Sequence, residues 1–187
     1  MKHGQIEGIC GPMYSGKTEE LLRRLRRAEI AGLDVLVLKP RLDNRYEPEM
    51  ACSHAGSRRA ANLVGVEKSD LEQIADRGLA STAQVIGLEE AQFFPSGIVG
   101  VCRAWQLSGR RVIWTGLDMD STGTPFGPVP QLMAIGAVTK LTAICVQCGA
   151  EATHTHRRAS VVAQDQVVVG GVEAYEARCL SCWIDRR

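Results

Sequence analysis

The chain has 187 residues, of which 45% are hydrophobic and 23% charged, and these fractions are typical of a globular protein and exclude an intrinsically disordered one. Its 22 Lys and Arg residues are balanced by 21 Asp and Glu residues, so the formal net charge is +1. This balance argues against a protein that binds nucleic acid or a membrane through its overall charge. We therefore expect any phosphate site to be local, and we expect neither a nucleic-acid nor a membrane partner.

The start of the chain and its cysteines indicate a cellular compartment. Residues 1–8 contain no apolar stretch of the kind found in a secretory signal, and no run of about 20 apolar residues could span a membrane. Four of the seven cysteines form two close pairs, which in a reducing compartment indicates metal binding rather than disulfides. We therefore expect a cytoplasmic protein.

The first part of the chain alternates between strand and helix patterns. Residues 5–10 predict a short strand, and a glycine-rich turn follows it. Residues 18–31 carry apolar side chains at helical spacing, and Gly32 stands where a glycine commonly ends a helix. The continuous apolar run at 35–38 is typical of a parallel strand that is covered on both faces.

The alternation continues after a polar interruption. Residues 41–62 lack periodicity, so we expect a long loop there, and loops of that length are often functional. Ser69 and Glu72 have the spacing of a capping box at the start of a short helix. The following patterns predict a buried strand at 85–88, a helix at 95–107 and a strand at 112–114. Alternating strands and helices of this period predict a doubly wound, parallel α/β sheet.

The pattern changes near residue 140. Beyond it, the β-branched segments at 161–162 and 167–169 are flanked by the two cysteine pairs, and no amphipathic helix is visible. We therefore expect two parts, which are an α/β domain at 1–140 and a small, β-rich lobe at 141–187.

A phosphate-binding loop is predicted where the first strand meets the first helix. The sequence there fits the P-loop pattern G-x-x-x-x-G-K-[ST] at every fixed position. In this pattern backbone N–H groups surround phosphate oxygens, the lysine reaches the β and γ phosphates, and the final hydroxyl can bind Mg²⁺. An ordinary glycine turn is the alternative, but the motif has the strand before it and the helix after it that it requires. The residues expected to bind ATP are Gly11, Pro12, Met13, Tyr14, Ser15, Gly16, Lys17 and Thr18.

Two acidic residues follow the predicted strand at 85–88. A P-loop protein needs a carboxylate at the end of a neighbouring strand to hold Mg²⁺, and Glu89 supplies one. In an extended chain Glu90 would point to the opposite side, toward the space beyond the γ phosphate. We therefore expect Glu90 to be the general base. The alternative is a solvated acidic strand end.

The two cysteine pairs have the spacing of zinc knuckles. Two C-x-x-C pairs can place four thiolates tetrahedrally around Zn²⁺, with the intervening segment forming a ribbon. Four free buried cysteines, or a reactive redox pair, are alternatives that do not explain the doubling. The expected ligands of a structural Zn²⁺ are Cys145, Cys148, Cys179 and Cys182.

The chain resembles the type II thymidine kinases, which are zinc-containing enzymes of the cytosolic type. The resemblance covers residues 8–182 in the family's order. It rests on the P-loop with the helix start at 19–24, and on the segments 89–95, 116–118, 125–127, 140–145 and 170–171, with Tyr175 ahead of Cys179. These motifs together are specific to that family.

This resemblance implies that the protein uses ATP and Mg²⁺ to phosphorylate the 5′-hydroxyl of thymidine. It implies that Glu90 is the general base and that Glu89, Glu90, Ala91 and Gln92 belong to the ATP site. It places Tyr175 and the backbone of Gln166, Val167, Val168, Val169 and Gly170 on a loop that closes over the thymine ring. Other residues implied around the nucleoside are Met13, Phe93, Leu117, Ser121 and Thr155. Family members are typically homotetramers inhibited by thymidine triphosphate, so we expect both properties here.

Two positions depart from the family pattern. The family usually has Asp at the position of Glu89, whose side chain is one methylene longer and would place a metal-bound water differently. It usually has an aromatic residue at the position of Ser121. A wall of the nucleoside pocket is therefore either missing or supplied by other residues.

Two other functions share some of these features. A zinc-containing P-loop ATPase that remodels nucleic acid should carry a basic stripe and stacking aromatics, whereas aromatics make up 5% of this chain. A non-catalytic nucleotide-binding protein is suggested only by Glu89 and Ser121, and the presence of Lys17 and Glu90 weighs against it.

Overall fold

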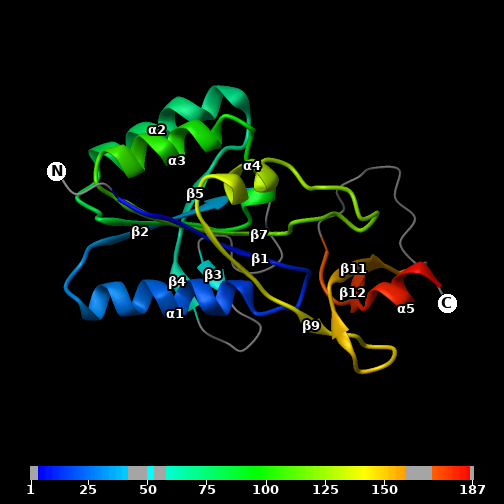
Figure 1. Ribbon diagram of the computed structural model, residues 1–187. Coiled ribbons are helices and arrows are strands. Elements are labelled where there is room, and N and C mark those ends of the chain that lie inside the picture. The colour runs from blue at the N-terminus through cyan, green and yellow to red at the C-terminus, as the bar shows by residue number, and fades with distance from the viewer. Residues whose placement is uncertain (1–3, 42–49, 53–57, 159–169, 186–187) are drawn as a thin grey trace.

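The computed structural model describes residues 4–41, 50–52, 58–158 and 170–185. A layered α/β domain carries a small lobe at one side, which contains the C-terminal helix α5 (Figure 1). No helix in the described part of the chain is long and apolar enough to cross a membrane.

A parallel sheet forms the centre of the α/β domain. Within the described residues it contains six strands in the order β5-β2-β6-β7-β1-β8, and every neighbouring pair is parallel. The fold class expected from the alternating pattern is confirmed. The strands are β1 (Ile6–Cys10), β2 (Val35–Pro40), β5 (Asn62–Val64), β6 (Val85–Leu88), β7 (Arg111–Gly116) and β8 (Ala137–Lys140).

Helices cover both faces of this sheet. The amphipathic helix α1 (Lys17–Ile30) lies on one face, where Leu21 and Leu25 pack against strand residues such as Ile9. On the other face lie α2 (Leu71–Ala80), α3 (Ile98–Leu107) and the short α4 (Val129–Ala134) (Figure 1). Trp105 of α3 and Trp114 of β7 are fully buried in the second core. Because both faces are covered, the central strands are apolar on both sides.

Glycines end two of these helices as expected. Gly32 and Gly109 follow α1 and α3 with φ of 78° and 90°, the left-handed conformation that favours glycine. The helix predicted from residue 95 starts at Ile98 instead, because Pro95–Gly97 form a turn in which the Ile98 N–H donates to the Pro95 carbonyl at 2.9 Å.

Two predictions for residues 41–72 are wrong. The expected long loop contains an antiparallel hairpin of β3 (Met50–Cys52) and β4 (Arg58–Ala60), followed by β5. The capping box uses Glu67 and Asp70 rather than Ser69 and Glu72, and it caps a 3₁₀ turn η1 (Lys68–Asp70) that precedes α2. The strands were missed because each has only three residues, too few to show a period.

The order of strands corrects a further prediction. The P-loop follows β1 and the acidic pair follows β6, but β7 lies between these strands in the sheet. The acidic pair therefore does not follow a strand next to the P-loop strand. Both segments still leave the same edge, because parallel strands all end at the same edge of a sheet.

The small lobe contains short elements around its own apolar cluster. Its paired strands are β9 (Ala143–Ile144) with β10 (Glu151–Ala152), and β11 (His154–Arg157) with β12 (Tyr175–Arg178). A five-residue helix, α5 (Leu180–Ile184), ends it, although the sequence indicated no helix there. The valine segments at 161–162 and 167–169 lie outside the described residues.

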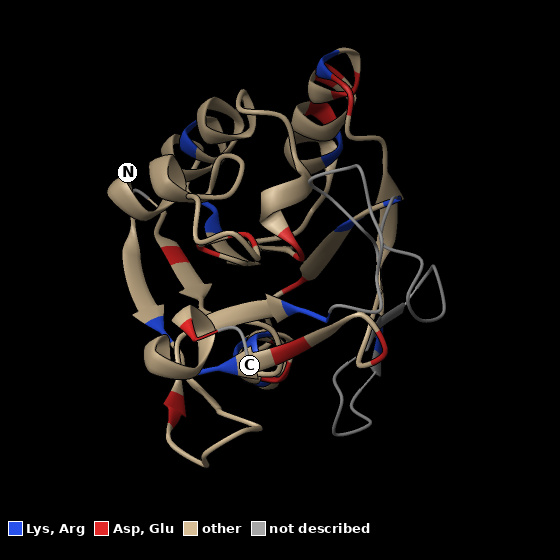
Figure 2. Cartoon of the chain, turned by 90° about the vertical axis from the view of Figure 1, so that its right-hand side faces the viewer, with Lys and Arg blue, Asp and Glu red and all other residues tan. Residues whose placement is uncertain are grey.

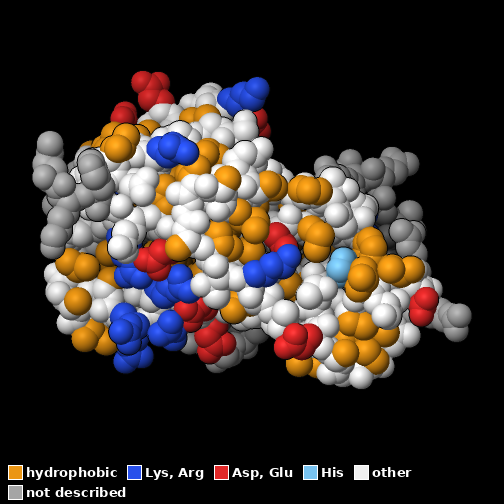
Figure 3. Space-filling view, viewed as in Figure 1, with side chains coloured by type: hydrophobic (Ala, Val, Ile, Leu, Met, Phe, Trp, Pro, Cys, Tyr) orange, Lys and Arg blue, Asp and Glu red, His pale blue; other side chains and the backbone are white. Residues whose placement is uncertain are grey.

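Charges of both signs are mixed over the molecule. Seen from the side of the lobe, Lys and Arg positions alternate with Asp and Glu positions (Figure 2). On the face shown in Figure 3, basic side chains likewise lie beside acidic ones. These views agree with the balanced net charge of the chain.

Candidate functional site

The glycine-rich segment after β1 forms a tight loop against the start of α1. Gly11 has a φ of 144°, and a Cβ at this position would lie 2.3 Å from the Leu141 carbonyl oxygen, so only glycine fits. Gly16 has a φ of 80° and directly precedes α1. The N-terminus of this 14-residue helix, with its unpaired N–H groups and positive dipole end, therefore adjoins the loop.

The side chains of the loop are ordered by its own backbone. The Lys17 ammonium donates to the Pro12 carbonyl at 2.6 Å, and the Ser15 hydroxyl donates to the same oxygen at 2.8 Å. Lys17 is buried, whereas Thr18, in the first turn of α1, is partly exposed. Gly11–Gly16 thus form the turn between β1 and α1, and Lys17 and Thr18 begin α1, as the motif requires.

Glu89 and Glu90 follow β6 at the same edge of the sheet. Glu89 is buried, and its N–H donates to the Leu38 carbonyl at 3.0 Å. Glu90 has φ 52° and ψ 51°, a left-handed conformation that is uncommon for a residue other than glycine. The expectation of an extended chain at Glu90 is therefore wrong, because the backbone reverses there into the 3₁₀ turn η2 (Ala91–Phe93).

Gln92, in this 3₁₀ turn, connects the acidic segment to the end of β7. Its side-chain amide donates to the Glu90 carboxylate, with a distance of 2.5 Å from Nε2 to Oε2. Its amide oxygen accepts the Leu117 N–H at 3.0 Å. Gln92 is 4% exposed, its hydrogen bond with Leu117 is buried, and its hydrogen bond with Glu90 is partly buried.

An apolar cluster lies beside the P-loop. It contains the buried Met13, Leu117, Ala174 and Tyr175, and Phe126 packs against it. The Phe126 ring also meets the Phe93 ring edge to face, with 5.8 Å between the centroids. The structure thus brings together four of the residues implied around the nucleoside.

Two hydrogen bonds join the P-loop to the small lobe. The Met13 N–H donates to the Thr155 hydroxyl of β11 at 3.0 Å. The Tyr14 hydroxyl donates to the Tyr175 carbonyl of β12 at 3.2 Å. Gly170 is described just ahead of β12, whereas Gln166–Val169 lie outside the described residues.

Ser121 lies in a turn away from this cluster. The Asp120 carboxylate holds the turn by accepting the N–H groups of Thr122 and Thr124. The indole N–H of Trp183 donates to the Ser121 carbonyl at 3.3 Å, and the Trp183 ring lies 4.8 Å from the ring of His154. Ser121 therefore contacts the C-terminal helix through its backbone.

An ion pair crosses the end of the P-loop strand. Asp118 follows β7 and Lys140 ends β8, on opposite sides of β1, and their charged groups are 2.6 Å apart. The hydrogen bond that Lys140 donates to Asp118 raises the pKa of Lys140. Burial and then the Asp118 charge raise the pKa of the Cys10 thiol to about 11, so this thiol between them stays protonated.

The four paired cysteines lie together in the lobe. Their sulfur atoms are all within 4.8 Å of one another, and those of Cys148 and Cys179 are 3.7 Å apart. A zinc ion with Zn–S distances of about 2.3 Å separates tetrahedral sulfur ligands by roughly 3.8 Å, so the four thiols fit that ion. Burial raises the pKa of Cys145, but backbone N–H groups, of which that of Cys179 is the strongest donor, lower it to about 6.

Comparisons with known proteins show the family of this chain. A family model described as thymidine kinase matches residues 4–183. The thymidine kinases of Halobacterium salinarum strains R1 and NRC-1 are each 47% identical to this chain over an alignment of 189 positions, which covers 98% of this chain and 96% of each relative. The chain belongs to the thymidine kinase family.

The fold of this chain is similar to that of solved structures of other proteins. Domain III of the Thermotoga maritima replication initiation protein DnaA superimposes with a TM-score of 0.45 at 13% identity, over 73% of this chain and 54% of that chain. Because this TM-score is low, the likeness supports no conclusion about this chain.

Three residues at the site had received no role from the sequence. Phe126 and Ala174 border the apolar cluster, and Asp118 forms the ion pair across β1. Phe126 and Asp118 lie in motifs that carry the thymidine kinase resemblance, so those motifs could have indicated a role for both residues. Ala174 had no signal, because a single alanine ahead of a strand is common.

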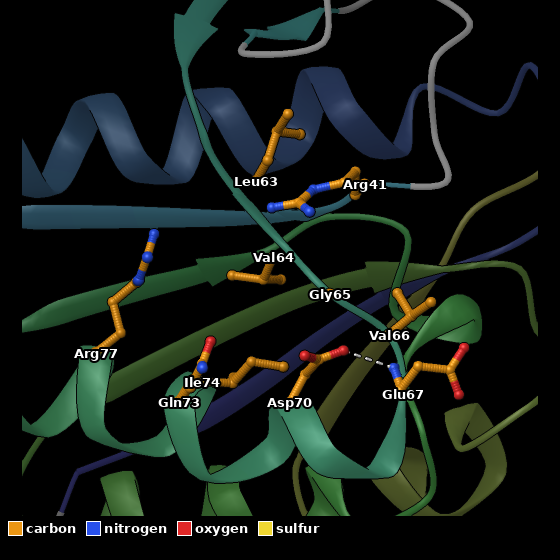
Figure 4. Close-up of a pocket in the computed structure, with 10 residues that line it drawn as sticks. All are labelled: Arg41, Leu63, Val64, Gly65, Val66, Glu67, Asp70, Gln73, Ile74 and Arg77. Carbon is orange, nitrogen blue, oxygen red and sulfur yellow. Dashed lines mark hydrogen bonds between the residues drawn. The ribbon is translucent and has the colours of Figure 1, made fainter.

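A separate cavity of about 450 Å³ lies between β5 and α2 (Figure 4). The side chains of Val64 and Ile74 form its apolar part, and those of Arg41 and Arg77 border it. Three strands lie between β5 and the P-loop strand β1, so this cavity is distinct from the thymidine kinase site.

Proposed function

We propose that this chain transfers the γ-phosphoryl group of ATP to the 5′-hydroxyl of thymidine, giving thymidine monophosphate and ADP. The observation that carries the proposal is the position of Met13, which belongs both to the P-loop and to the buried apolar cluster. The loop proposed to bind phosphate and the apolar cluster are therefore contiguous. That contiguity suits a reaction in which a phosphate donor and a nucleoside with a planar base must meet.

The P-loop residues Gly11–Thr18 would bind the phosphates of ATP. Backbone N–H groups at the start of α1 favour negative charge there, and Lys17 would exchange its bond with the Pro12 carbonyl for bonds with phosphate oxygens. The donor set of the Thr18 hydroxyl and the Glu89 carboxylate consists of oxygen atoms, which Mg²⁺ prefers. Bound Mg²⁺ would neutralise charge on the phosphates during transfer.

Glu90 would be the general base that accepts the proton of the 5′-hydroxyl. Its partly buried carboxylate accepts a hydrogen bond from Gln92, which supports an acceptor held in a fixed position. Because most of the catalysis of phosphoryl transfer is positioning and electrostatic stabilisation, a fixed base is more useful than a strong one.

The apolar cluster would hold the thymine ring and the sugar. Met13, Leu117 and Thr155 would surround the base, with Phe93 and Tyr175 at its sides. Phe126 would form an aromatic wall of the nucleoside pocket. It would supply a ring on this side of the pocket, whereas Ser121 lies in a separate turn. We retain Ser121 and the backbone of Gln166–Gly170 as predicted nucleoside contacts.

The four cysteines would hold a structural Zn²⁺ that stabilises the small lobe. We propose that the lobe is the unit 141–187 and that the nucleotide-binding domain is the unit 1–140. Arg178 of β12 donates to the Cys182 carbonyl at 2.9 Å and pairs with the buried Glu176, which links the second knuckle to the lobe's sheet. We also propose a cytoplasmic homotetramer that thymidine triphosphate inhibits and that binds neither nucleic acid nor membranes.

The test is ADP formation from ATP with each nucleoside in turn, using zinc-containing protein and added Mg²⁺. We expect ADP release that depends on thymidine, its loss in Lys17→Ala, and its retention in a control variant at an exposed lysine, Lys68→Ala. ADP release without any nucleoside, or none with thymidine, would overturn the proposal.

A further inference from the structure

We propose that Gln92 is a positioning residue for Glu90 rather than a ligand of ATP. The inference rests on the proposed function of Glu90 as the general base. It differs from the role that the family resemblance implies, which places Gln92 in the ATP site.

The orientation of the Gln92 amide follows from its partners. The Leu117 N–H can only donate, so the amide oxygen must face it, at 3.0 Å. The NH₂ group of the same amide must then face Glu90, at 2.5 Å from Oε2. Because an NH₂ group only donates, Glu90 Oε2 is the acceptor in this contact, and the contact fixes the direction of the Glu90 side chain.

Two glycines lie close to Gln92, one at its backbone and the other at its side-chain amide. A Cβ at Gly127 would lie 2.2 Å from the Gln92 carbonyl oxygen, so glycine there lets the two segments meet. A Cβ at Gly116 would lie 3.1 Å from the Gln92 amide oxygen, which shows how closely the end of β7 approaches the amide. Gln92 is held by two segments that come from other parts of the chain.

The same contacts leave Gln92 poorly placed to bind ATP. It is 4% exposed, and both polar ends of its side chain are engaged by other residues of the protein. Glu90 itself is partly exposed and has a left-handed backbone, which points to a residue held in place by its surroundings. Gln92 links that residue to Leu117, a member of the apolar cluster.

The experiment is a double-mutant cycle on turnover, with Gln92→Leu, Glu90→Gln and the two combined. We expect Gln92→Leu to lower kcat by about 10- to 100-fold, because a misplaced base loses much of its effect. The KM for ATP should change by less than about twofold, since no ATP contact is removed. In the Glu90→Gln background, Gln92→Leu should change kcat by less than about twofold, because its effect acts through Glu90.

The outcomes separate this inference from the proposed function. If Glu90→Gln keeps wild-type turnover, both the base and its positioning residue are wrong. If Glu90→Gln is slow but Gln92→Leu lowers kcat by the same factor with and without Glu90→Gln, only the inference about Gln92 fails. The same holds if Glu90→Gln is slow and Gln92→Leu raises the KM for ATP with kcat unchanged. Gln106→Leu in α3 makes the same chemical change away from the site and should leave kcat and both KM values unchanged.

A second variant keeps the test valid if Gln92→Leu does not fold. If Gln92→Leu does not reach the melting temperature of Gln106→Leu within a few degrees, Gln92→Met replaces it in the cycle, because its unbranched side chain fills the same slot. The same three outcomes then apply to Gln92→Met. Gln92→Met with wild-type kcat would also overturn the inference.

Discussion

Glu90 combines a left-handed backbone with a partly buried carboxylate that accepts a hydrogen bond from Gln92. This conformation costs about 1–3 kcal/mol for a residue other than glycine, so the surrounding contacts must hold it. The sequence predicted an acidic residue at the strand end, but its pattern assumed an extended chain. Leu117 and Gly127 approach Gln92, two residues after this reversal, and no local pattern contains such long-range contacts.

We expect Glu90→Gln to lower kcat by about 10²-fold or more, because general-base catalysis contributes at least that much. The affinity for ATP should stay nearly unchanged, whereas Lys17→Ala should weaken ATP binding and turnover together. Steady-state kinetics with an ADP-binding titration test both. Turnover near the wild-type rate in Glu90→Gln would assign the base to another group, and Asp43, which lies outside the described residues, is the next to test.

Phe126 and Ser121 give a second test at the level of single residues. Phe126 packs on the apolar cluster, so Phe126→Ala should raise the KM for thymidine by about tenfold or more, since buried aromatic area is lost. Ser121→Phe should lower this KM with little effect on the ATP KM, because the added ring restores the aromatic area that the family usually has at this position. An unchanged thymidine KM in Ser121→Phe would show that the turn contacted by Trp183 does not border the nucleoside.

The helices and strands of the α/β domain could largely be predicted, because their apolar residues follow the expected periods. The order of the strands could not, because β7 is inserted between β6 and β1 by tertiary packing. The β3–β4 hairpin and the Glu67–Asp70 cap were also missed. Strands of three residues are too short to show a period, and the predicted capping motif lay two residues too far along the chain.

A cluster on β1 connects three elements and depends on pH. Glu7 pairs with Arg111 of β7 at 2.5 Å and with Arg24 of α1 at 3.0 Å. Burial would raise the pKa of Glu7, but Arg111 and then Arg24 outweigh it and lower the pKa. The hydrogen bond from Arg23 is the main cause that lowers the pKa of Glu20 in α1 to about 2.

These shifts predict loss of stability in acid. A carboxyl with a lowered pKa stabilises the fold above its unfolded pKa, about 4.3, and this contribution is lost as the pH falls through the folded pKa. The free energy of unfolding should therefore fall between about pH 5 and pH 2. Glu7→Gln should lower it at pH 7 and flatten its fall between pH 5 and 3, measured by urea unfolding. The exposed control Glu151→Gln should change neither quantity, and an equal slope in Glu7→Gln would contradict the prediction.

At the scale of the whole molecule, the small lobe contributes to both proposed substrate sites. Thr155 and Tyr175 hydrogen-bond the P-loop, and Ala174 and Tyr175 complete the apolar cluster. The lobe has few buried residues of its own around the four cysteines, so the metal should supply much of its folding free energy. The cysteine spacing predicted where the thiols would gather, but nothing in it indicated that the lobe touches the P-loop.

Removal of the metal should therefore impair both substrates. With a chelator, or in Cys148→Ser, we expect a lower melting temperature, loss of thymidine binding and weaker ATP binding. Calorimetric titration of each substrate, with zinc content measured in the same samples, tests this. Cys102→Ser, at a buried cysteine of α3, controls for loss of a thiol elsewhere. Fully active protein that contains no zinc would refute the prediction.

Met13 restricts how this enzyme could evolve. Its backbone N–H donates a hydrogen bond to the Thr155 hydroxyl, and its side chain packs with Leu117 and Tyr175. Its neighbours in the chain are P-loop residues. A substitution that reshapes the pocket at this position to admit a different acceptor must also disturb the loop proposed to bind ATP. New acceptor preferences should therefore arise first at Phe126 or Ala174, which border the same pocket from segments outside the P-loop.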